Sequence, residues 1–394
     1  MRQSMTSLES VREKFEYSPE RIIQPKPKKT TNFEKIIKCR DILRENVKNT
    51  IQFSKPIITI NGQPLFYPRT INVIQGKSGT HKSRLAEHLC STLLKNDNNN
   101  VNILGLDIGE SKQISVVYVD TERNLSEQYP YSLQQILKNA GYNITDELNY
   151  FDFISLIEIE RCERFNSFRE YLEKIREDHK GHIFVILDVL TDLVDNFNDP
   201  KPSLQLIDLL NSAINTYDIT FLCIIHENPF QEKARGHLGT ELLNKSSTAL
   251  SINYEKDNKG NDQDIIKITF LKCRSSKKID SVYVKFSQEK HQLIYADSLD
   301  IEKAIYNKDT KANIFDISKF LVDNLKAIKS KKDLTKILGQ EFKCTTRTIE
   351  DRYKDLLTGA GLNTLGYKLK STKKGKEIYY SLEKILPDNQ ENIF

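Results

Sequence analysis

The residues with the clearest potential for chemistry lie in the segment INVIQGKSGTHKS, residues 71–83. A phosphate-binding loop follows the pattern G-x-x-x-x-G-K-[S/T], in which backbone N–H groups wrap the phosphates, the lysine reaches the terminal phosphates and the hydroxyl binds Mg²⁺. Gly76, Lys82 and Ser83 match this pattern, whereas His81 stands where its second glycine is expected. The sequence predicts a nucleotide site built from Gly76, Lys77, Ser78, Gly79, Thr80, His81, Lys82 and Ser83.

The residues on either side of this loop predict the elements that position it. TINVIQ before the loop is typical of a buried β-strand, and KSRLAEHLCSTLLK after it places Leu85, Leu89 and Leu93 on one face of a helix. A strand, a turn and a helix in this order direct the free N–H groups of the helix N-terminus at an anion. Gly79 is able to take a positive φ. The alternative is a strand–turn–helix unit that does not bind nucleotide.

Two carboxylates follow other apolar strands. GHIFVILDVL ends near Asp188, where a carboxylate is able to hold Mg²⁺ through water, and ISVVYVDTERN places Glu122 directly after a strand. Attack on a γ-phosphate needs a water molecule that a base holds in line and polarises, which is the role that Glu122 would fill. The alternative for Glu122 is a surface side chain at the end of a strand.

Further polar side chains lie at the ends of later strands. DITFLCIIHENP ends on His226, and in ITFLKCRSSKK the cations of Lys272 and Arg274 emerge on the same side of an extended segment. Between them, KARGHLGTELLNKSSTALSI carries glycines and the basic or polar residues Arg235, His237 and Lys245, which is typical of a mobile loop.

The chain resembles the RecA-superfamily ATPase core over residues 51–296, and within that superfamily the RepA-like hexameric replicative helicases, often encoded by plasmids and other mobile elements. The resemblance implies ATP and Mg²⁺ as cofactors, with Ser83 and Asp188 at the metal. It implies that Glu122 is the catalytic base and that His226 senses the γ-phosphate. It further implies a homo-oligomer, expected as a hexameric ring, in which Lys272 and Arg274 reach the neighbouring subunit's site as an arginine finger. The loop with Arg235, His237 and Lys245 would line a DNA channel.

Composition sets the broad class of the protein. At 394 residues, with 38% hydrophobic and 29% charged residues, the chain is long enough for two or three globular domains. No apolar run approaches the roughly 20 residues of a membrane span, and the N-terminus lacks the apolar core of a signal peptide, so we expect a cytoplasmic protein with no membrane partner. Six scattered cysteines without a C-x-x-C pair indicate free thiols.

The pattern along the chain predicts a mostly parallel α/β sheet with helices on both faces and antiparallel hairpins at its C-terminal edge, followed by a small helical domain. The expected strands are INVIQ, ISVVYVD, FDFISL, IFVILD and TFLCIIH. We expect a polar arm, linker and helix over residues 1–50, the ATPase core over 51–296, a linker over 297–312, the small domain over 313–386 and a tail over 387–394. The segment 96–113 is longer than a minimal connection, and the sequence assigns it no role.

The C-terminal segment carries the positive charge. Residues 311–394 contain 17 Lys and Arg against 11 Asp and Glu, a net +6, whereas the whole chain is +5. Three expected helices and a basic hairpin follow the plan of a winged helix-turn-helix, whose third helix enters the DNA major groove. The predicted DNA contacts are Thr346, Arg347 and Arg352 on that helix, which Thr345 or Thr346 would cap, and Lys373, Lys374 and Lys376 in the wing. A winged helix that binds protein, or a lid on the ATPase, is the alternative.

Together these features favour an ATP-hydrolysing DNA motor or loader that acts in the replication or transfer of a mobile element, with replication or transfer proteins as further partners. A second hypothesis is an ATP-switch regulator of transposition, recombination or transcription that binds DNA and never translocates. A third is a structural DNA binder without ATPase activity, because His81 departs from the loop pattern.

Overall fold

The computed structural model describes residues 31–96, 103–109, 114–229, 231–257, 260–274, 276–277, 279–306 and 312–385. The chain divides into two compact units, Met1–Phe53 and Ser54–Phe394. Residues 1–30, which fall in the expected polar arm and linker, and the expected tail at 387–394 lie outside the described residues.

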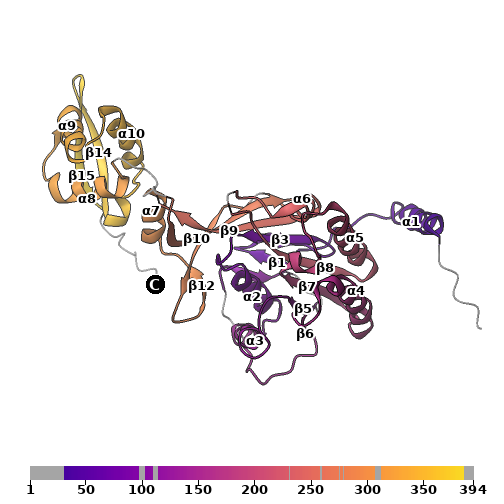
Figure 1. Ribbon diagram of the computed structural model, residues 1–394. Coiled ribbons are helices and arrows are strands. Elements are labelled where there is room, and N and C mark those ends of the chain that lie inside the picture. The colour runs from indigo at the N-terminus through magenta and orange to yellow at the C-terminus, as the bar shows by residue number, and fades with distance from the viewer. Residues whose placement is uncertain are drawn as a thin grey trace, which may run out of the picture. The chain divides into compact units, whose positions relative to one another are not determined.

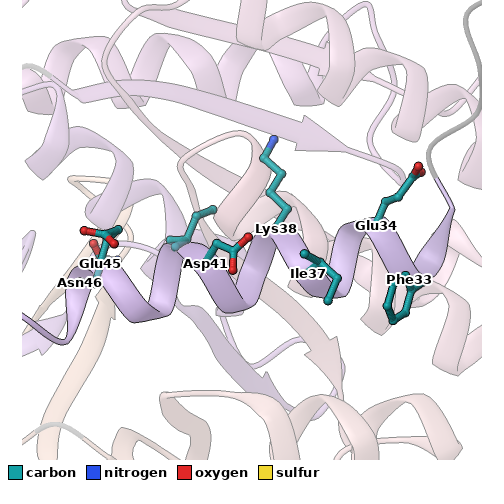
Figure 2. A pocket seen from close by; sticks show the side chains of 8 residues that line it. Phe33, Glu34, Ile37, Lys38, Asp41, Glu45 and Asn46 are labelled. Carbon is teal, nitrogen blue, oxygen red and sulfur yellow. The ribbon is translucent and has the colours of Figure 1, made fainter.

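The first unit contains one described helix, α1 (Asn32–Asn46), as predicted. Thr31 and Glu34 form a capping box, in which the Glu34 backbone N–H donates to Thr31 Oγ1 at 3.2 Å and the Thr31 N–H donates to Glu34 Oε2 at 2.7 Å. None of its residues is buried, and Phe33 is 70% exposed. Figure 2 shows Phe33 and Ile37 on the same side of α1, along a hollow that α1 residues alone line.

The second unit is built on a large sheet, which confirms the predicted fold class. In the described residues its order is β12-β11-β10-β9-β3-β8-β7-β5-β6. Neighbours from β9 to β6 run parallel, whereas β9 to β12 pair antiparallel. The strands are β3 (Ile71–Gly76), β5 (Ile114–Asp120), β6 (Phe151–Ser155), β7 (His182–Asp188), β8 (Ile219–His226), β9 (Thr248–Lys256), β10 (Asp262–Cys273), β11 (Val282–Ser287) and β12 (Gln292–Tyr295). All five strands expected in the parallel part are present.

Helices cover both faces of the sheet (Figure 1). The helices α2 (Lys82–Leu93) and α3 (Gln128–Ala140) pack on one face, and α4 (Arg161–Asp178), α5 (Pro200–Thr216) and α6 (Gly236–Lys245) pack on the other. Strand β5 shows how both cores form, because Val116 and Tyr118 belong to the first and Val117 and Val119 to the second. Burial on both faces explains why the central strands are continuous apolar runs.

A second, small sheet joins the face that carries α2. It has the order β2-β1-β4, from β1 (Ile58–Ile60), β2 (Gln63–Phe66) and β4 (Leu106–Ile108), and its apolar residues belong to the same core as α2. The sequence patterns did not predict this sheet. Strand β4 lies within the long segment 96–113, so part of that segment completes a sheet, while residues 97–102 and 110–113 lie outside the described residues.

The C-terminal segment has a core of its own, which includes Ile317, Leu338 and Ile349. Its elements are α8 (Ile314–Asn324), β13 (Lys329–Ser330), α9 (Lys331–Glu341), α10 (Thr346–Leu357), the 3₁₀ turn η2 (Asn363–Leu365), β14 (Tyr367–Lys374) and β15 (Glu377–Lys384). The strands pair in the order β13-β15-β14. The three expected helices and the hairpin are therefore present. A further helix, α7 (Ser298–Tyr306), lies in the segment expected as a linker.

Among the described residues, no helix has both the length and the apolar character that a membrane crossing requires. All six cysteines are free thiols, as predicted, and Cys90 and Cys223 are buried in the core.

Candidate nucleotide site

The loop between β3 and α2 has the geometry of an anion cradle. A Cβ on Gly76 would lie 2.3 Å from the Ile252 carbonyl oxygen, so only glycine fits there, and Gly79 has a φ of +77°. Lys82 Nζ donates to the Lys77 carbonyl at 2.7 Å, which folds the lysine back over the loop. Because the first N–H groups of α2 have no acceptor within the helix, this end of the helix is suited to bind phosphate.

His81 occupies the left-handed region that a glycine would favour, with φ 64° and ψ 29°. Its ring stacks on Phe286 of β11 at a centroid distance of 4.6 Å, and its Nε2 lies 2.9 Å from the Tyr254 hydroxyl of β9. Burial, followed by the nearby Arg84 cation, lowers the pKa of His81. A left-handed conformation costs roughly 1–2 kcal/mol and an aromatic pair contributes about 0.5–1.5 kcal/mol, so these contacts offset much of the cost of a non-glycine residue.

The sheet register places the candidate residues at one edge. Gly76 at the end of β3 lies opposite His226 at the end of β8. Asp188 at the end of β7 lies opposite Asp120 at the end of β5, and Glu122 follows two residues later. Because all four strands are parallel, their carboxyl ends meet at the same edge, where ligands bind in open α/β sheets.

Lys82 is 6% exposed and lies among carboxylates. Burial lowers the pKa of Lys82, and the charges of Asp188, Glu122 and Glu227 act in the opposite direction, in that order. The structure therefore brings together the cation and both carboxylates that the sequence singled out.

Glu122 and His226 form a pair, with Glu122 Oε1 3.6 Å from His226 Nε2. The Glu122 side chain is 51% exposed. The contact with His226 lowers the pKa of Glu122, with smaller contributions from the charges of Lys82 and Arg123, and burial opposes them. A carboxylate that stays ionised and open to solvent is suited to polarise water.

Asp188 is 3% exposed, and protein donors hold one of its oxygens. Its Oδ2 accepts hydrogen bonds from the Tyr118 hydroxyl at 2.9 Å and from Arg123 Nη2 at 3.1 Å. The Asp188 carboxylate and the Ser83 hydroxyl are hard oxygen donors of the kind that Mg²⁺ prefers, and Mg²⁺ at nucleotide sites takes only one or two protein ligands beside phosphate and water. The described residues contain no group of three or more His, Cys, Asp and Glu side chains that could hold a metal ion.

Sequence patterns gave no indication of the network behind the loop. The buried Glu227, which follows His226, accepts hydrogen bonds from Gln75 Nε2 at 2.7 Å, Ser251 Oγ at 2.8 Å and Asn253 Nδ2 at 3.0 Å. Asn253 Oδ1 in turn accepts the backbone N–H of Lys77 at 3.2 Å. This network fastens the loop between β3 and α2 to β9. Its only sequence signal is polar residues in otherwise apolar strands.

Lys272 and Arg274 lie at the end of β10 and bind the C-terminus of α6. Lys272 Nζ donates to the carbonyls of Leu243 at 2.5 Å and Asn244 at 3.1 Å, and Arg274 Nη2 donates to the Asn244 carbonyl at 2.6 Å. The last carbonyls of a helix attract cations. Within the described residues, none of these hydrogen bonds joins the pair to the chain's own phosphate loop.

The segment expected as a mobile loop after Lys233 is instead mostly the helix α6, so that expectation was wrong. Leu238 and Leu242 fall four residues apart and are buried against α5, which gives the helix an apolar face that its glycines obscure in the sequence. Arg235 precedes the helix with its guanidinium carbon 4.8 Å from the Phe197 ring centroid. Arg235 and Lys245 are exposed and His237 is half-buried.

Most predicted DNA-contact residues of the C-terminal segment are exposed. Thr345 caps α10 by accepting the Thr348 N–H at 3.3 Å, as expected, and Thr346 and Arg347 begin the helix at the surface. Arg352 differs, because it is half-buried and its Nε donates to the Ala312 carbonyl at 3.1 Å. The wing residues are all exposed, and they are Lys373, Lys374 and Lys376.

No family model matches the chain, and no curated protein matches it. Among solved structures, the crystal structure of the RadB recombinase is similar, with 14% sequence identity and a TM-score of 0.42, over 60% of this chain and 95% of that one.

Proposed function

We propose that the chain is a P-loop ATPase that uses Mg²⁺. The observation that supports this most strongly is the meeting of Lys82, Glu122 and Asp188 at one sheet edge, beside the N-terminus of α2. In a strand–turn–helix look-alike, nothing would require two carboxylates and a buried lysine to converge there.

Each residue has a distinct role in this proposal. Lys82 and the loop N–H groups bind the terminal phosphates, and Ser83 and Asp188 would hold Mg²⁺, which neutralises charge on the phosphate oxygens. Glu122 accepts a proton from the attacking water, and His226 fixes the direction of its carboxylate through their pairing.

Turnover of ATP by the purified chain, with and without Mg²⁺, tests this proposal. Asp188→Ala removes a metal ligand and is expected to abolish turnover. Asp192→Ala is the matched control, because that nearby aspartate pairs with Arg161 and Arg164 and not with site residues. Equal turnover in the two variants, or no turnover by the unchanged chain, would exclude the proposed site.

We further propose that the segment from residue 313 is a winged helix-turn-helix that binds DNA. Its element order α8-β13-α9-α10-β14-β15 supports this, and so does the net charge of +6 over residues 311–394. In this arrangement α10 presents Thr346 and Arg347 to base edges and the wing lysines contact phosphates. Because Arg352 is bound to Ala312, its proposed role is to orient α10 as well as to contact DNA.

We propose a ring, expected as a hexamer, in which Lys272 and Arg274 act on the neighbouring subunit's nucleotide. Their extended spacing and their shared direction toward the C-terminus of α6 support this role. The basic residues around α6, namely Arg235, His237 and Lys245, are proposed to line the DNA channel of this ring.

The activity that fits these parts is that of a RepA-like helicase or loader for a mobile element. A second candidate is an ATP-dependent switch that assembles on DNA without translocation. In either candidate, Lys272 and Arg274 must leave the α6 carbonyls before they can act on a neighbour. Strand displacement on a forked DNA distinguishes the two, since only the helicase separates the strands.

A further inference from the structure

One arginine, Arg123, links four elements around the proposed site. It directly follows Glu122, and its backbone N–H and Nε donate to the two oxygens of Asp120 at 2.8 and 2.6 Å. Its Nη1 donates to Glu87 Oε1 of α2 at 2.8 Å and to Ser132 Oγ of α3 at 2.9 Å. Its Nη2 donates to Asp188 Oδ2 of β7 at 3.1 Å. Every nitrogen of the guanidinium therefore has an acceptor.

The surroundings of Arg123 hold it in place. Its side chain is 16% exposed, and its guanidinium carbon lies 5.3 Å and 5.2 Å from the ring centroids of Tyr118 and Tyr129. Three carboxylates contact it. Because these partners hold the guanidinium from several sides, its contact with Asp188 is a fixed part of the site.

The hydrogen bonds give the two oxygens of the Asp188 carboxylate different surroundings. Arg123 and Tyr118 both donate to Oδ2, and among the described residues no donor reaches Oδ1. A carboxylate anchored through one oxygen is free to use the other toward metal-bound water, in a fixed direction. This is the way in which outer partners orient metal ligands.

The same arginine also sets the turn that carries Glu122. Asp120 Oδ1 accepts the backbone N–H groups of Glu122 and Arg123 at 3.1 and 2.8 Å, and Arg123 Nε holds the other oxygen. Movement of Arg123 would thus reorient the Asp188 carboxylate and shift Glu122 at the same time.

We infer that Arg123, with Tyr118, is a positioning residue that fixes Asp188 toward Mg²⁺ and fixes the turn bearing Glu122. This inference rests on the proposed ATPase function. It predicts that Arg123 acts on the metal-dependent part of nucleotide binding and on turnover, and that it has little effect on metal-free binding.

Arg123→Lys tests the inference, because lysine keeps the charge but cannot bridge four elements. The first readout is the affinity for a fluorescent ADP analogue with and without Mg²⁺. The gain in affinity that Mg²⁺ gives is expected to fall about tenfold or more, as when other outer partners of a metal site are removed. The turnover number for ATP is expected to fall by a similar factor, while metal-free affinity stays within about threefold.

Arg164→Lys is the matched control, because Arg164 is also buried, with a side chain 10% exposed, and contacts Asp192 at 3.5 Å outside the site. It should leave both readouts unchanged. If Arg123→Lys matches this control, or if metal-free affinity and melting temperature fall together with the Mg²⁺ effect, Arg123 has no positioning role.

Tyr118→Phe serves if Arg123→Lys fails to fold, because it keeps the ring and removes only the second donor to Asp188 Oδ2. It should reduce the Mg²⁺ gain in the same direction, and an unchanged gain would contradict the inference. Failure of the ATPase proposal looks different, because the unchanged chain would then show no Mg²⁺ effect at all.

Discussion

The proposed nucleotide site and the C-terminal segment differ in how they use charge. At the proposed nucleotide site several charged groups are buried and paired across elements, as with Asp188, 3% exposed, and its partner Arg123. In the C-terminal hairpin the charges are at the surface, as in the pair of Lys370 and Glu383, whose side chains are 58% and 51% exposed. A surface pair of this kind contributes only about 0–1 kcal/mol.

This difference indicates two kinds of function. A buried network fixes directions, so the loss of one member should cost a large factor in rate. Exposed lysines act through the electric field that they share, so the loss of each lysine should lower DNA affinity by a small and similar amount. The following predictions test this contrast, from the largest effect to the smallest.

A large effect is expected at the proposed finger. Arg274→Ala should reduce turnover about a thousandfold or more, as does the loss of other arginine fingers. Mixing this variant with Lys82→Ala should restore activity, because an intact loop meets an intact finger at about a quarter of the interfaces of a randomly mixed ring. No recovery in demonstrably mixed oligomers would argue against action in trans.

Glu122→Gln should lower turnover by about 100-fold to 10,000-fold while nucleotide binding is retained, because the amide keeps the shape but is a poor base. The lowered pKa of Glu122 means that its carboxylate is ionised at neutral pH. The full reduction in turnover by Glu122→Gln should therefore be seen at neutral pH. Glu127→Gln, at an exposed position on the same segment, is the control. Loss of nucleotide binding in Glu122→Gln would assign this residue to the metal site or to the fold.

The wing should show graded behaviour. Replacing Lys373, Lys374 and Lys376 with alanine should weaken binding to all DNA sequences and lower the slope of log affinity against log salt by about three. The control replaces the exposed lysines Lys319, Lys326 and Lys336, which lie outside α10 and the hairpin. An equal change in both triple variants would show that net charge alone matters and not the wing.

The smallest effect is expected at His81. His81→Gly relieves the left-handed backbone but loses the stack on Phe286, and these changes are of similar size, so turnover should stay within about threefold. Melting temperature and turnover check this together. A loss of tenfold or more would mean that the histidine has a role beyond holding the loop.

The sequence was sufficient for the parts of the molecule that depend on local pattern. Buried apolar runs predicted the parallel strands, and the pattern around Lys82 predicted the strand, turn and helix that β3 and α2 form. The helix cap at Thr345 was likewise local.

The parts that sequence patterns missed depend on distant contacts. Nothing in the letters TERN marks Arg123, because its partners on α2, α3 and β7 are brought near it only by the packing of the helices and the register of the sheet. Helix α6 was mistaken for a loop because its glycines hid an apolar face that packing on α5 reveals. The environment of His81 could not be foreseen either, since Phe286 is about two hundred residues away in the chain.

The most direct test of the central claim is the ATP turnover of Lys82→Ala beside that of the unchanged chain and of Lys138→Ala, an exposed lysine on α3. We predict that the unchanged chain and Lys138→Ala hydrolyse ATP at the same rate. Lys82→Ala should lose at least about 100-fold with an unchanged melting temperature, because its charge is directed at the phosphates. Turnover by Lys82→Ala at the rate of the unchanged chain would contradict the nucleotide site.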